Sequence, residues 1–296
     1  MKIVESKVEY LPQGEGLDEM YKHIERCGRV CYKSEDKITE GSAKKFVDNI
    51  IKNKHLGVIE HGTVYLQVPR EAVHKGEFGF DCYDSHSVII AMPDFAITTN
   101  LRVIQENCEE DTLKYICEPT KYHERRYTFK FICSRGIADE LRTHRPFSYC
   151  MESTRYVNYN KQEDMEFVST SGAALNTGRY EWNNGFIVGD GYIEDTQDPS
   201  AERILLRHWM ESEHSYNTMI ALGMKPQDAR AVLPLSIKTT LVMTGFASDW
   251  REFLDKRLFE KTGKVHPDMK ILMKKLQKVA EDAGIWEDII SHHSKY

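Results

Sequence analysis

The segment Leu141–Tyr156 reads LRTHRPFSYCMESTRY and is the most informative stretch of the chain. No apolar period of a helix or a strand runs through it, and Arg142, Arg145 and Arg155 stand among hydroxyl side chains. Guanidinium groups donate hydrogen bonds in a forked pattern that matches the oxygens of phosphates and carboxylates. The segment therefore predicts a site for an anionic small molecule.

The overall composition restricts what that anion is. The chain has 296 residues, 41% of them apolar, which is enough to bury one large core or two modest ones and argues against disorder. Its net charge of −6 does not favour a protein that is held to a nucleic acid polymer by bulk charge. We therefore expect a local basic site that takes a small ligand.

The cysteines and the N-terminal sequence are typical of a cytoplasmic protein. Seven cysteines at irregular spacing do not make a disulfide framework in a chain of this length, so reduced thiols fit better. The opening MKIVESKVEYLPQGEG lacks the apolar core of a signal peptide, and no run approaches the roughly 18 apolar residues that cross a bilayer. We expect a cytoplasmic protein that does not bind membranes.

Periodicity predicts an α/β protein of the α+β type, with a mixed sheet flanked by helices. The domain is expected to be single and to span residues 1–296, with insertions at 70–126 and 164–196, where the patterns are hardest to interpret. Alternation predicts strands within residues 1–11, 63–68 and 127–133. Helical spacing and caps predict helices at 17–30, 39–53, 137–145, 199–222, 226–233, 249–260, 266–283 and 286–290.

Two further arginines lie inside apolar helical stretches. Arg230 sits within ARAVL, and Arg257 follows Phe253 and Leu254 by about one helical turn. Burying a guanidinium without a partner is costly, so each side chain either reaches solvent or meets an anion. Exposure on the surface remains the plainer alternative. Together with Arg155, these residues are candidates for one phosphate clamp.

Three other interpretations of the sequence stay open. Cys150 is a candidate nucleophile because neighbouring arginines favour the thiolate, although it could equally be a small buried residue. A zinc site at His74, Cys82 and His86 matches no compact zinc pattern and lacks a clear fourth ligand. The segment KYHERRYTFKF, residues 121–131, could stack nucleic acid bases, but its alternating second half favours a core strand.

The segment HRPFSYCMESTRY resembles the signature of the flavin-dependent thymidylate synthases, which runs Arg-His-Arg, seven residues, Ser, and then Arg-Tyr. His144 and Arg145 stand at its second and third positions, and seven residues separate Arg145 from Ser153. Arg155 and Tyr156 complete the signature, whereas Thr143 replaces its first arginine. Similar segments that follow in the family's order are CGRVCYKSEDK, HLGVIEH, FKFICSRGIADELRTHR, RYVNYNK, MKPQDARAVLP and WREFLDKRL.

This resemblance implies roles for individual residues. The residues implied to bind dUMP are Glu140, Ser153, Arg155, Arg230 and Arg257. The residues implied to bind FAD are Gly57, His144, Arg145, Glu152 and Ser248. Arg257 is implied to be catalytic by polarising the pyrimidine, and His55 by lying close to the flavin and the reacting folate. No metal is implied.

The resemblance also implies a fold, a reaction and an assembly. Members of the family methylate dUMP to dTMP: NADPH reduces FAD, methylenetetrahydrofolate gives the one-carbon unit, and reduced flavin supplies hydride. They are homotetramers whose sites lie between subunits. Met151, Phe246 and Ser248 depart from the family's flavin-binding residues. Two alternatives therefore stay open: a related enzyme that modifies the nucleotide differently, such as by hydroxymethylation of dUMP, and a nucleotide-binding relative that has lost FAD.

Overall fold

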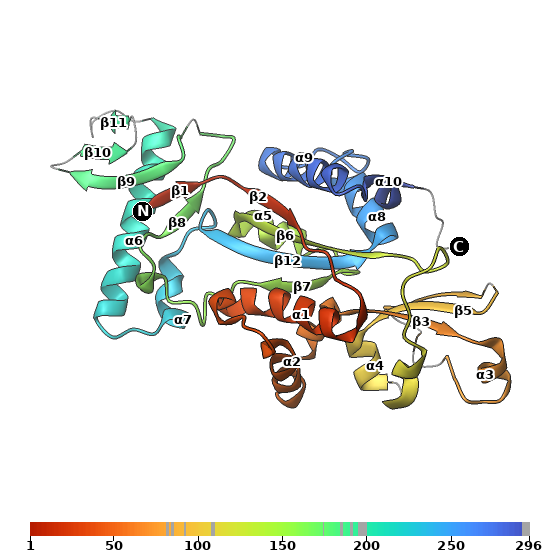
Figure 1. The fold of residues 1–296 in the computed structure, drawn as a ribbon. Coiled ribbons are helices and arrows are strands. Elements are labelled where there is room, and N and C mark those ends of the chain that lie inside the picture. Colours follow the sequence, from red (N-terminus) through yellow and green to blue (C-terminus); the bar gives the residue numbers. More distant parts are fainter. Residues whose placement is uncertain are drawn as a thin grey trace.

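The computed structural model describes residues 1–80, 83, 86–91, 93–107, 110–173, 175–183, 186–189, 192–194 and 200–291. In these ranges the strands form sheets of four, five and three strands, with helices around them (Figure 1). The fold is therefore a mixture of sheets and helices, which confirms the predicted class. No helix in the described ranges combines the length and the apolar character needed to cross a bilayer.

The four-stranded sheet forms the centre of the molecule. Its order is β2 (Lys7–Tyr10), β6 (Arg126–Ser134), β12 (Lys238–Phe246) and β7 (Ser148–Met151), and all neighbouring strands are antiparallel. The alternation in YTFKFIC correctly predicted β6, because Phe129, Phe131 and Cys133 all lie in the core. Every residue of β12 after Lys238 is buried, so this strand is covered on both faces.

Helices cover the two faces of the central sheet. α8 (Ala247–Arg257), α9 (Pro267–Asp282) and α10 (Trp286–Ile290) pack on one face around the fully buried Trp250. The Trp250 ring meets Phe129 and Phe147 edge-on, at centroid distances of 4.9 and 4.7 Å, and its Nε1 donates to the Tyr127 carbonyl. α1 (Gly16–Arg29) lies on the other face, where Cys27 packs with Val242 of β12 (Figure 1).

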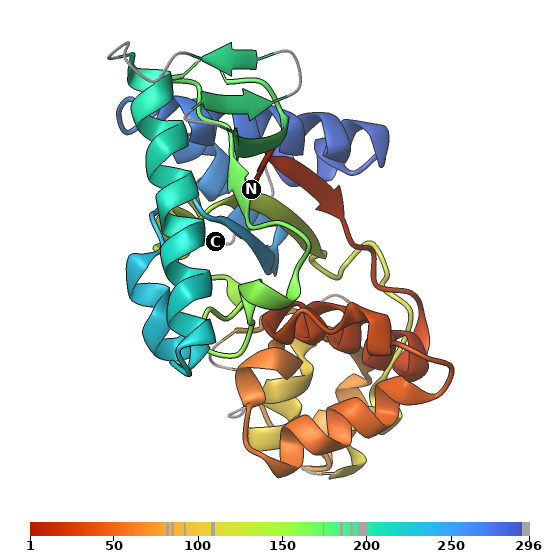
Figure 2. The same ribbon diagram turned by 90° about the vertical axis from the view of Figure 1, so that its left-hand side faces the viewer.

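The five-stranded sheet has the order β11 (Tyr192–Glu194), β10 (Phe186–Gly189), β9 (Gly178–Asn183), β1 (Lys2–Val4) and β8 (Glu166–Val168). The long helix α6 (Ala201–Ala221) lies alongside it (Figure 2), and Phe167 stacks on Trp209 of that helix. The strand expected within residues 1–11 is divided in two. β1 pairs with β8 and β9, whereas β2 pairs with β6, so the chain passes from one sheet to the other at Glu5 and Ser6.

The three-stranded sheet has the order β3 (Thr63–Val68), β5 (Phe95–Asn100) and β4 (Val88–Ala91). It shares a core with α1, α2 (Ser42–Lys52), α3 (Arg70–His74) and α4 (Leu101–Asn107). β5 pairs with β3 along its whole length, and β8 pairs with β1. The division into one domain with insertions at 70–126 and 164–196, parts of which lie outside the described residues, stays a prediction.

The polar segment Leu141–Tyr156 differs from its expected structure in two ways. The helix expected at 137–145 is α5 (Arg135–Leu141), which ends before Thr143, whose hydroxyl donates to the Glu140 carbonyl. The segment also contains β7, which the sequence did not reveal. Only Ser148 and Cys150 of this short strand are buried, and a serine and a cysteine leave no apolar period to recognise.

Shorter elements complete the description. The helix expected at 226–233 is a single α-helical turn, α7 (Pro226–Ala229), that tightens into a 3-10 turn. The 3-10 turns are η1 (Val30–Tyr32), η2 (Glu35–Lys37), η3 (Leu56–His61), η5 (Glu110–Tyr115), η6 (Tyr159–Lys161) and η7 (Arg230–Val232).

Candidate functional site

Two of the predicted nucleotide-binding arginines come from segments of the chain that are in contact. After β7 the chain enters a turn that carries Ser153, Thr154 and Arg155, and Arg230 at the end of α7 donates from Nη1 to Thr154 Oγ1 at 3.1 Å. Arg155 is exposed, and its guanidinium lies 5.3 Å from the centroid of the Tyr156 ring. No carboxylate among the described residues forms an ion pair with Arg155 or Arg230. We call these two residues the open arginine pair.

The third predicted arginine has partners of its own. Arg257, in the last turn of α8, donates from Nε to His144 Nε2 at 2.9 Å, and its Nη1 lies 3.7 Å from Glu140 Oε2. The His144 ring meets Phe253 edge-on at 4.7 Å. Burial and the positive charge of Arg257 lower the pKa of His144 to about 4, so the ring is neutral at pH 7 and accepts the hydrogen bond.

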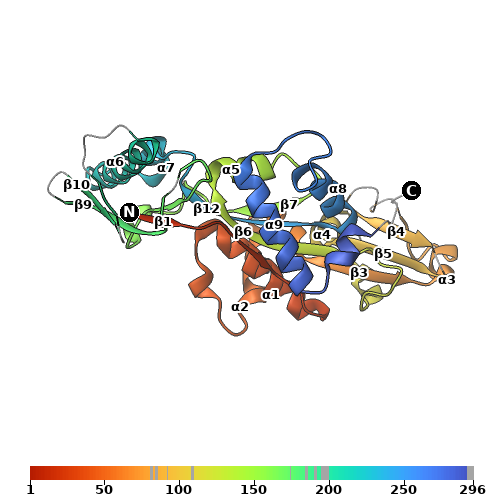
Figure 3. The same cartoon turned by 90° about the horizontal axis from the view of Figure 1, so that it is seen from above.

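The three arginines of the predicted clamp are not gathered within a single chain. Figures 1 and 3 place α7 and α8 at opposite ends of β12, and the residues that Arg257 contacts are not those that Arg230 contacts. The clamp therefore stays a prediction, and it requires a second copy of the chain to bring Arg257 to the open arginine pair.

The residues predicted to bind FAD are dispersed as well. Gly57 in η3 and Arg145 are both exposed, and no side chain or backbone atom lies within 4 Å of where a Gly57 Cβ would be. His144 accepts a hydrogen bond from Arg257. Ser248 donates from both its backbone nitrogen and its hydroxyl to Glu124. Within one chain these side chains do not converge on one pocket.

Glu152, the fifth of these residues, is buried and contacts Tyr159 and Lys238. Its side chain is only 2% exposed, and its carboxylate accepts a hydrogen bond from the Tyr159 hydroxyl at 3.1 Å. Lys238 Nζ lies 3.7 Å away and supplies the opposite charge. A carboxylate satisfied in this way holds β12 to the loop after β7 and has little capacity left for a cofactor in this chain.

The two histidines of η3 have different environments. His55, the predicted catalytic residue, is exposed at the start of the turn. His61 at its end is fully buried, with Nδ1 2.7 Å from Thr244 Oγ1. Burial, with a smaller contribution from Arg126, lowers the pKa of His61 to about 3, so this ring is neutral.

The structure weakens the alternative of a cysteine nucleophile. Cys150 is 2% exposed, and its thiol is hydrogen-bonded to Cys31. That hydrogen bond, together with burial, raises the pKa of Cys150 well above its ordinary value, whereas the pKa of Cys31 is lowered. A buried protonated thiol is a poor nucleophile, so the contacts favour a packing role for Cys150.

The structure does not test the zinc alternative, because Cys82 lies outside the described residues. Among those that are described, no three His, Cys, Asp or Glu side chains are grouped so that they could hold a metal ion.

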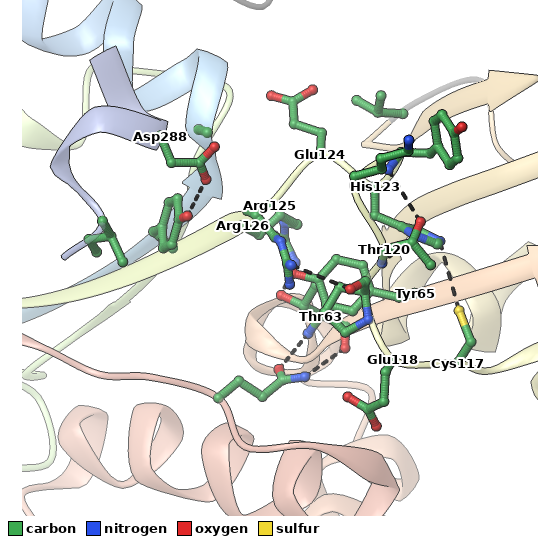
Figure 4. A pocket seen from close by; sticks show the side chains of 18 of the residues that line it. Thr63, Tyr65, Cys117, Glu118, Thr120, His123, Glu124, Arg125, Arg126 and Asp288 are labelled. Carbon is green, nitrogen blue, oxygen red and sulfur yellow. Dashed lines mark hydrogen bonds between the residues drawn. The ribbon is translucent and has the colours of Figure 1, made fainter. Parts of the chain in front are cut away.

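A large cavity lies away from the signature segment. Its volume is about 980 Å³, it opens to solvent on one side, and it is lined by residues of β2, β3, β4, the start of β6 and α10 (Figure 4). Of the residues predicted to bind substrate or cofactor, Ser248 alone lines it. Sequence reasoning missed this cavity. Its one signal was the basic and aromatic segment 121–131, from which Arg125, Arg126 and Tyr127 all reach the wall.

The sequence model of the Thy1 family, described as thymidylate synthase complementing protein, matches residues 99–282, which is more than half of the chain. This chain belongs to the Thy1 family. The matched residues run from the end of β5 to the end of α9 and include the signature segment, the open arginine pair and Arg257.

Two curated proteins are similar to this Thy1 member. A probable flavin-dependent thymidylate synthase of Paramecium bursaria Chlorella virus 1 is 28% identical over 142 residues, which are 48% of this chain and 61% of that protein. A flavin-dependent thymidylate synthase of Synechocystis is 26% identical over 151 residues, which are 50% of this chain and 64% of that protein. In both cases the chain spans less than two thirds of the relative's length.

A solved structure is also similar. The crystal structure of a UMP/dUMP methylase, PolB from Streptomyces cacaoi, bound with 5-Br dUMP, has a TM-score of 0.44 to this Thy1 member. The sequence identity is 16%, and the alignment covers 98% of this chain and 95% of that chain.

Proposed function

We propose that this chain is an enzyme that methylates dUMP to dTMP with FAD, NADPH and methylenetetrahydrofolate. Membership of the Thy1 family supports the proposal, and one observation carries it. The open arginine pair, Arg155 and Arg230, lies beside Ser153 of the signature segment and has no carboxylate partner in the described part of the chain. Arg230 contacts Thr154, the residue before Arg155, and two guanidinium groups carried by segments in contact suit a nucleotide phosphate.

The remaining predicted residues would complete the nucleotide site. Ser153 would add a hydrogen bond to dUMP next to the open arginine pair. Glu140 and Arg257, which are 3.7 Å apart at the end of α5 and α8, would come from a neighbouring copy. There the guanidinium of Arg257 would place fixed positive charge where electron density develops on the uracil ring. Holding nucleotide and cofactors in register is the other contribution of the protein.

The cofactors supply the chemistry that the side chains lack. When bound, the flavin carries hydride from NADPH and the folate carries the one-carbon unit. The five predicted FAD residues lie apart within one chain, so we propose a homotetramer in the cytoplasm whose sites lie between subunits. His55, exposed on η3, would then face the flavin and folate of such a site, and its solvent exposure in one chain supports this placement.

Two measurements test the proposal. We expect purified protein to show the visible spectrum of a flavin after FAD is added, at close to one flavin per chain. We also expect release of tritium from dUMP labelled at C5, with dTMP as the product. Tritium release with a different pyrimidine product would favour hydroxymethylation or another modification. Binding of dUMP without any binding of FAD would identify a nucleotide-binding protein and contradict the proposal.

A further inference from the structure

Three cysteines from different parts of the chain meet in one small core beside the signature segment. Cys27 of α1 and Cys150 of β7 are buried there, and Cys31 of η1 packs against them. All three thiols are free. Cys150 is 2% exposed, whereas Cys31 is only half-buried. The cluster therefore holds one thiol that a dissolved oxidant can reach and two that it cannot.

Within this cluster Cys150 is the partner of Cys31, because a hydrogen bond joins their thiols. Cys27 has a different partner, since its Sγ lies 3.7 Å from His23 Nε2. A backbone contact holds the two segments in register, because Ser153 N donates to the Cys31 carbonyl at 3.0 Å. Two sulfurs in hydrogen-bond contact need only a small shift to reach the roughly 2.05 Å of a disulfide bond. The pair is therefore placed for a disulfide between η1 and β7.

The two thiols differ in how readily they ionise. The hydrogen bond that Cys150 donates, with a further one from the Met151 backbone, lowers the pKa of Cys31 against the opposing effect of burial. The same hydrogen bond, together with burial, raises the pKa of Cys150 well above its ordinary value. The thiolate is the form that attacks an oxidant. Cys31 is therefore the attacking sulfur, and Cys150 is the one that follows it.

Two other cysteines of the described part of the chain lack this combination. Cys117 is half-buried as Cys31 is, but burial raises its pKa. Cys133 is buried, and its pKa rises to about 12 for the same reason. Cysteines that respond to oxidants have an accessible thiol, a lowered pKa and a second thiol nearby. Cys31 has all three features.

We propose that Cys31 and Cys150 are a redox-sensitive pair, which hydrogen peroxide converts into a reversible intramolecular disulfide that weakens dUMP binding. In the first step the Cys31 thiolate attacks one peroxide oxygen and the O–O bond breaks. The other oxygen leaves as hydroxide and takes up a proton from solvent to become water. Cys31 is then a sulfenic acid.

The second step closes the disulfide. Cys150 gives up its proton, and its sulfur attacks the Cys31 sulfur. The bond between sulfur and oxygen breaks, and the oxygen leaves with that proton as a second water. The two thiols are oxidised together by two electrons, and the peroxide is reduced to water. Oxidation of Cys31 also makes Cys150 easier to ionise, because the hydrogen bond to Cys31 is the largest cause of its raised pKa.

The disulfide acts on the nucleotide site, and this part of the inference rests on the proposed function. η1 contacts the signature segment on both sides of Arg155. The Cys31 carbonyl accepts the hydrogen bond from Ser153 N before it, and the Tyr32 ring lies 5.3 Å from the Tyr156 ring after it, between centroids. Drawing η1 towards β7 shifts both contacts and moves Arg155 away from the phosphate.

Peptide mapping by mass spectrometry tests the pair. The full chain is reduced with dithiothreitol, freed of it, treated with hydrogen peroxide, alkylated and digested. We expect a cross-linked peptide that carries Cys31 and Cys150, lighter than its two parts by the two thiol hydrogens, which dithiothreitol separates again. Cys31→Ser should form no cross-link, and Cys150→Ala should accumulate a sulfenic acid at Cys31 that dimedone traps. Cys117→Ser, at the other half-buried thiol, is the matched control and should form the cross-link normally.

Titration of dUMP into the reduced and the oxidised protein tests the consequence. We expect the oxidised protein to bind dUMP at least about tenfold more weakly, as loss of one charged hydrogen bond does, and dithiothreitol to restore the affinity. Cys31→Ser should keep its dUMP affinity after peroxide treatment.

The absence of a cross-link in the unaltered protein overturns the inference, and so does a cross-link from Cys31 to Cys27. Unchanged dUMP affinity in fully cross-linked protein also overturns it and leaves the proposed function standing. Reduced protein that binds no dUMP contradicts the proposed function instead, and the peptide map then decides the cysteine pair alone. Because the map uses the unaltered chain, this decision does not depend on the folding of any variant.

Discussion

Two pairs of arginines in this protein lack carboxylate partners among the described residues, and they differ in how they meet solvent. Arg155 and Arg230 stand exposed on a surface turn, whereas Arg126 is half-buried in a cavity wall beside Arg125. Burial lowers the pKa of Arg126 to about 10, and the nearby Tyr65, Asp249 and Glu60 oppose this shift. An exposed arginine without a partner costs little, because water solvates it.

The two pairs of arginines differ in what their surroundings indicate about a bound ligand. The negative charges of Asp249 and Glu60 act on Arg126, and its guanidinium lies 5.4 Å from the centroid of the Phe246 ring, so its burial does not by itself require a ligand. The open arginine pair indicates a ligand through its position, beside Ser153 in a Thy1 family signature.

The largest effect is expected in the core that supports both pairs. Replacing the fully buried Trp250 with Ala should lower the free energy of unfolding by about 4 kcal/mol, because a large cavity opens beside Phe129, Phe147 and Phe253. Chemical denaturation measures this loss. Trp182→Ala, at a half-exposed tryptophan of β9, is the control and should cost much less. Equal losses in both variants would show that Trp250 does not hold the common core.

A pH effect on stability is expected from the buried His61 of η3. The pKa of His61 is about 3 in the folded chain and about 6.5 when unfolded, so between these values only the unfolded state takes up the proton. Stability is therefore lost as pH falls, by about 1.6 kcal/mol between pH 6.5 and pH 5 from this group. Urea unfolding across this range should show a shallower pH dependence for His61→Asn than for the unaltered protein. The exposed His55→Asn should keep the full dependence, and identical slopes in all three proteins would contradict the assignment.

A smaller effect is expected at Cys150, which packs with Cys27, Val30 and Val242. Cys150→Ala should lower the free energy of unfolding by about 1 kcal/mol, as loss of one small buried group does, and should leave dUMP affinity and methylation intact. Cys133→Ala, at another buried thiol, is the matched control. Thermal melts and the tritium assay provide the readouts. A folded Cys150→Ala protein without any turnover would restore the cysteine nucleophile.

The smallest change in the free energy of unfolding is expected for a substitution within the open arginine pair. Arg230→Gln should change the free energy of unfolding by no more than about 0.5 kcal/mol, because the side chain is exposed and gives up one hydrogen bond to Thr154. Chemical denaturation is again the measurement. A large loss would mean that Arg230 is structural and would remove the distinction between the two pairs.

Sequence reasoning succeeded where the signal was local. Neighbouring residues alone produce the alternation in β6 and the helical spacing of α8 and α9. The structure confirms these three elements. β7 was missed because a four-residue strand with buried Ser148 and Cys150 owes its existence to pairing with β12, almost a hundred residues later.

The cavity was missed for a related reason. The sequence HERRY shows two adjacent arginines at the start of a strand, and nothing in this local pattern indicates that both line one cavity. Whether one side opens to solvent or to a cavity depends on β3 and β4, which come much earlier in the chain. The open arginine pair was easier to find because Arg155 belongs to a recognisable signature and Arg230 stands out as a charge within the apolar stretch ARAVL.

The account depends most on the assignment of the dUMP phosphate to the open arginine pair. Titration of dUMP into the unaltered protein, Arg155→Gln, Arg230→Gln and the cavity variant Arg126→Gln tests it directly. We predict that Arg155→Gln and Arg230→Gln each weaken dUMP binding by about 2 kcal/mol or more, while Arg126→Gln retains the original affinity. Unchanged dUMP affinity in both open-pair variants would contradict the assignment.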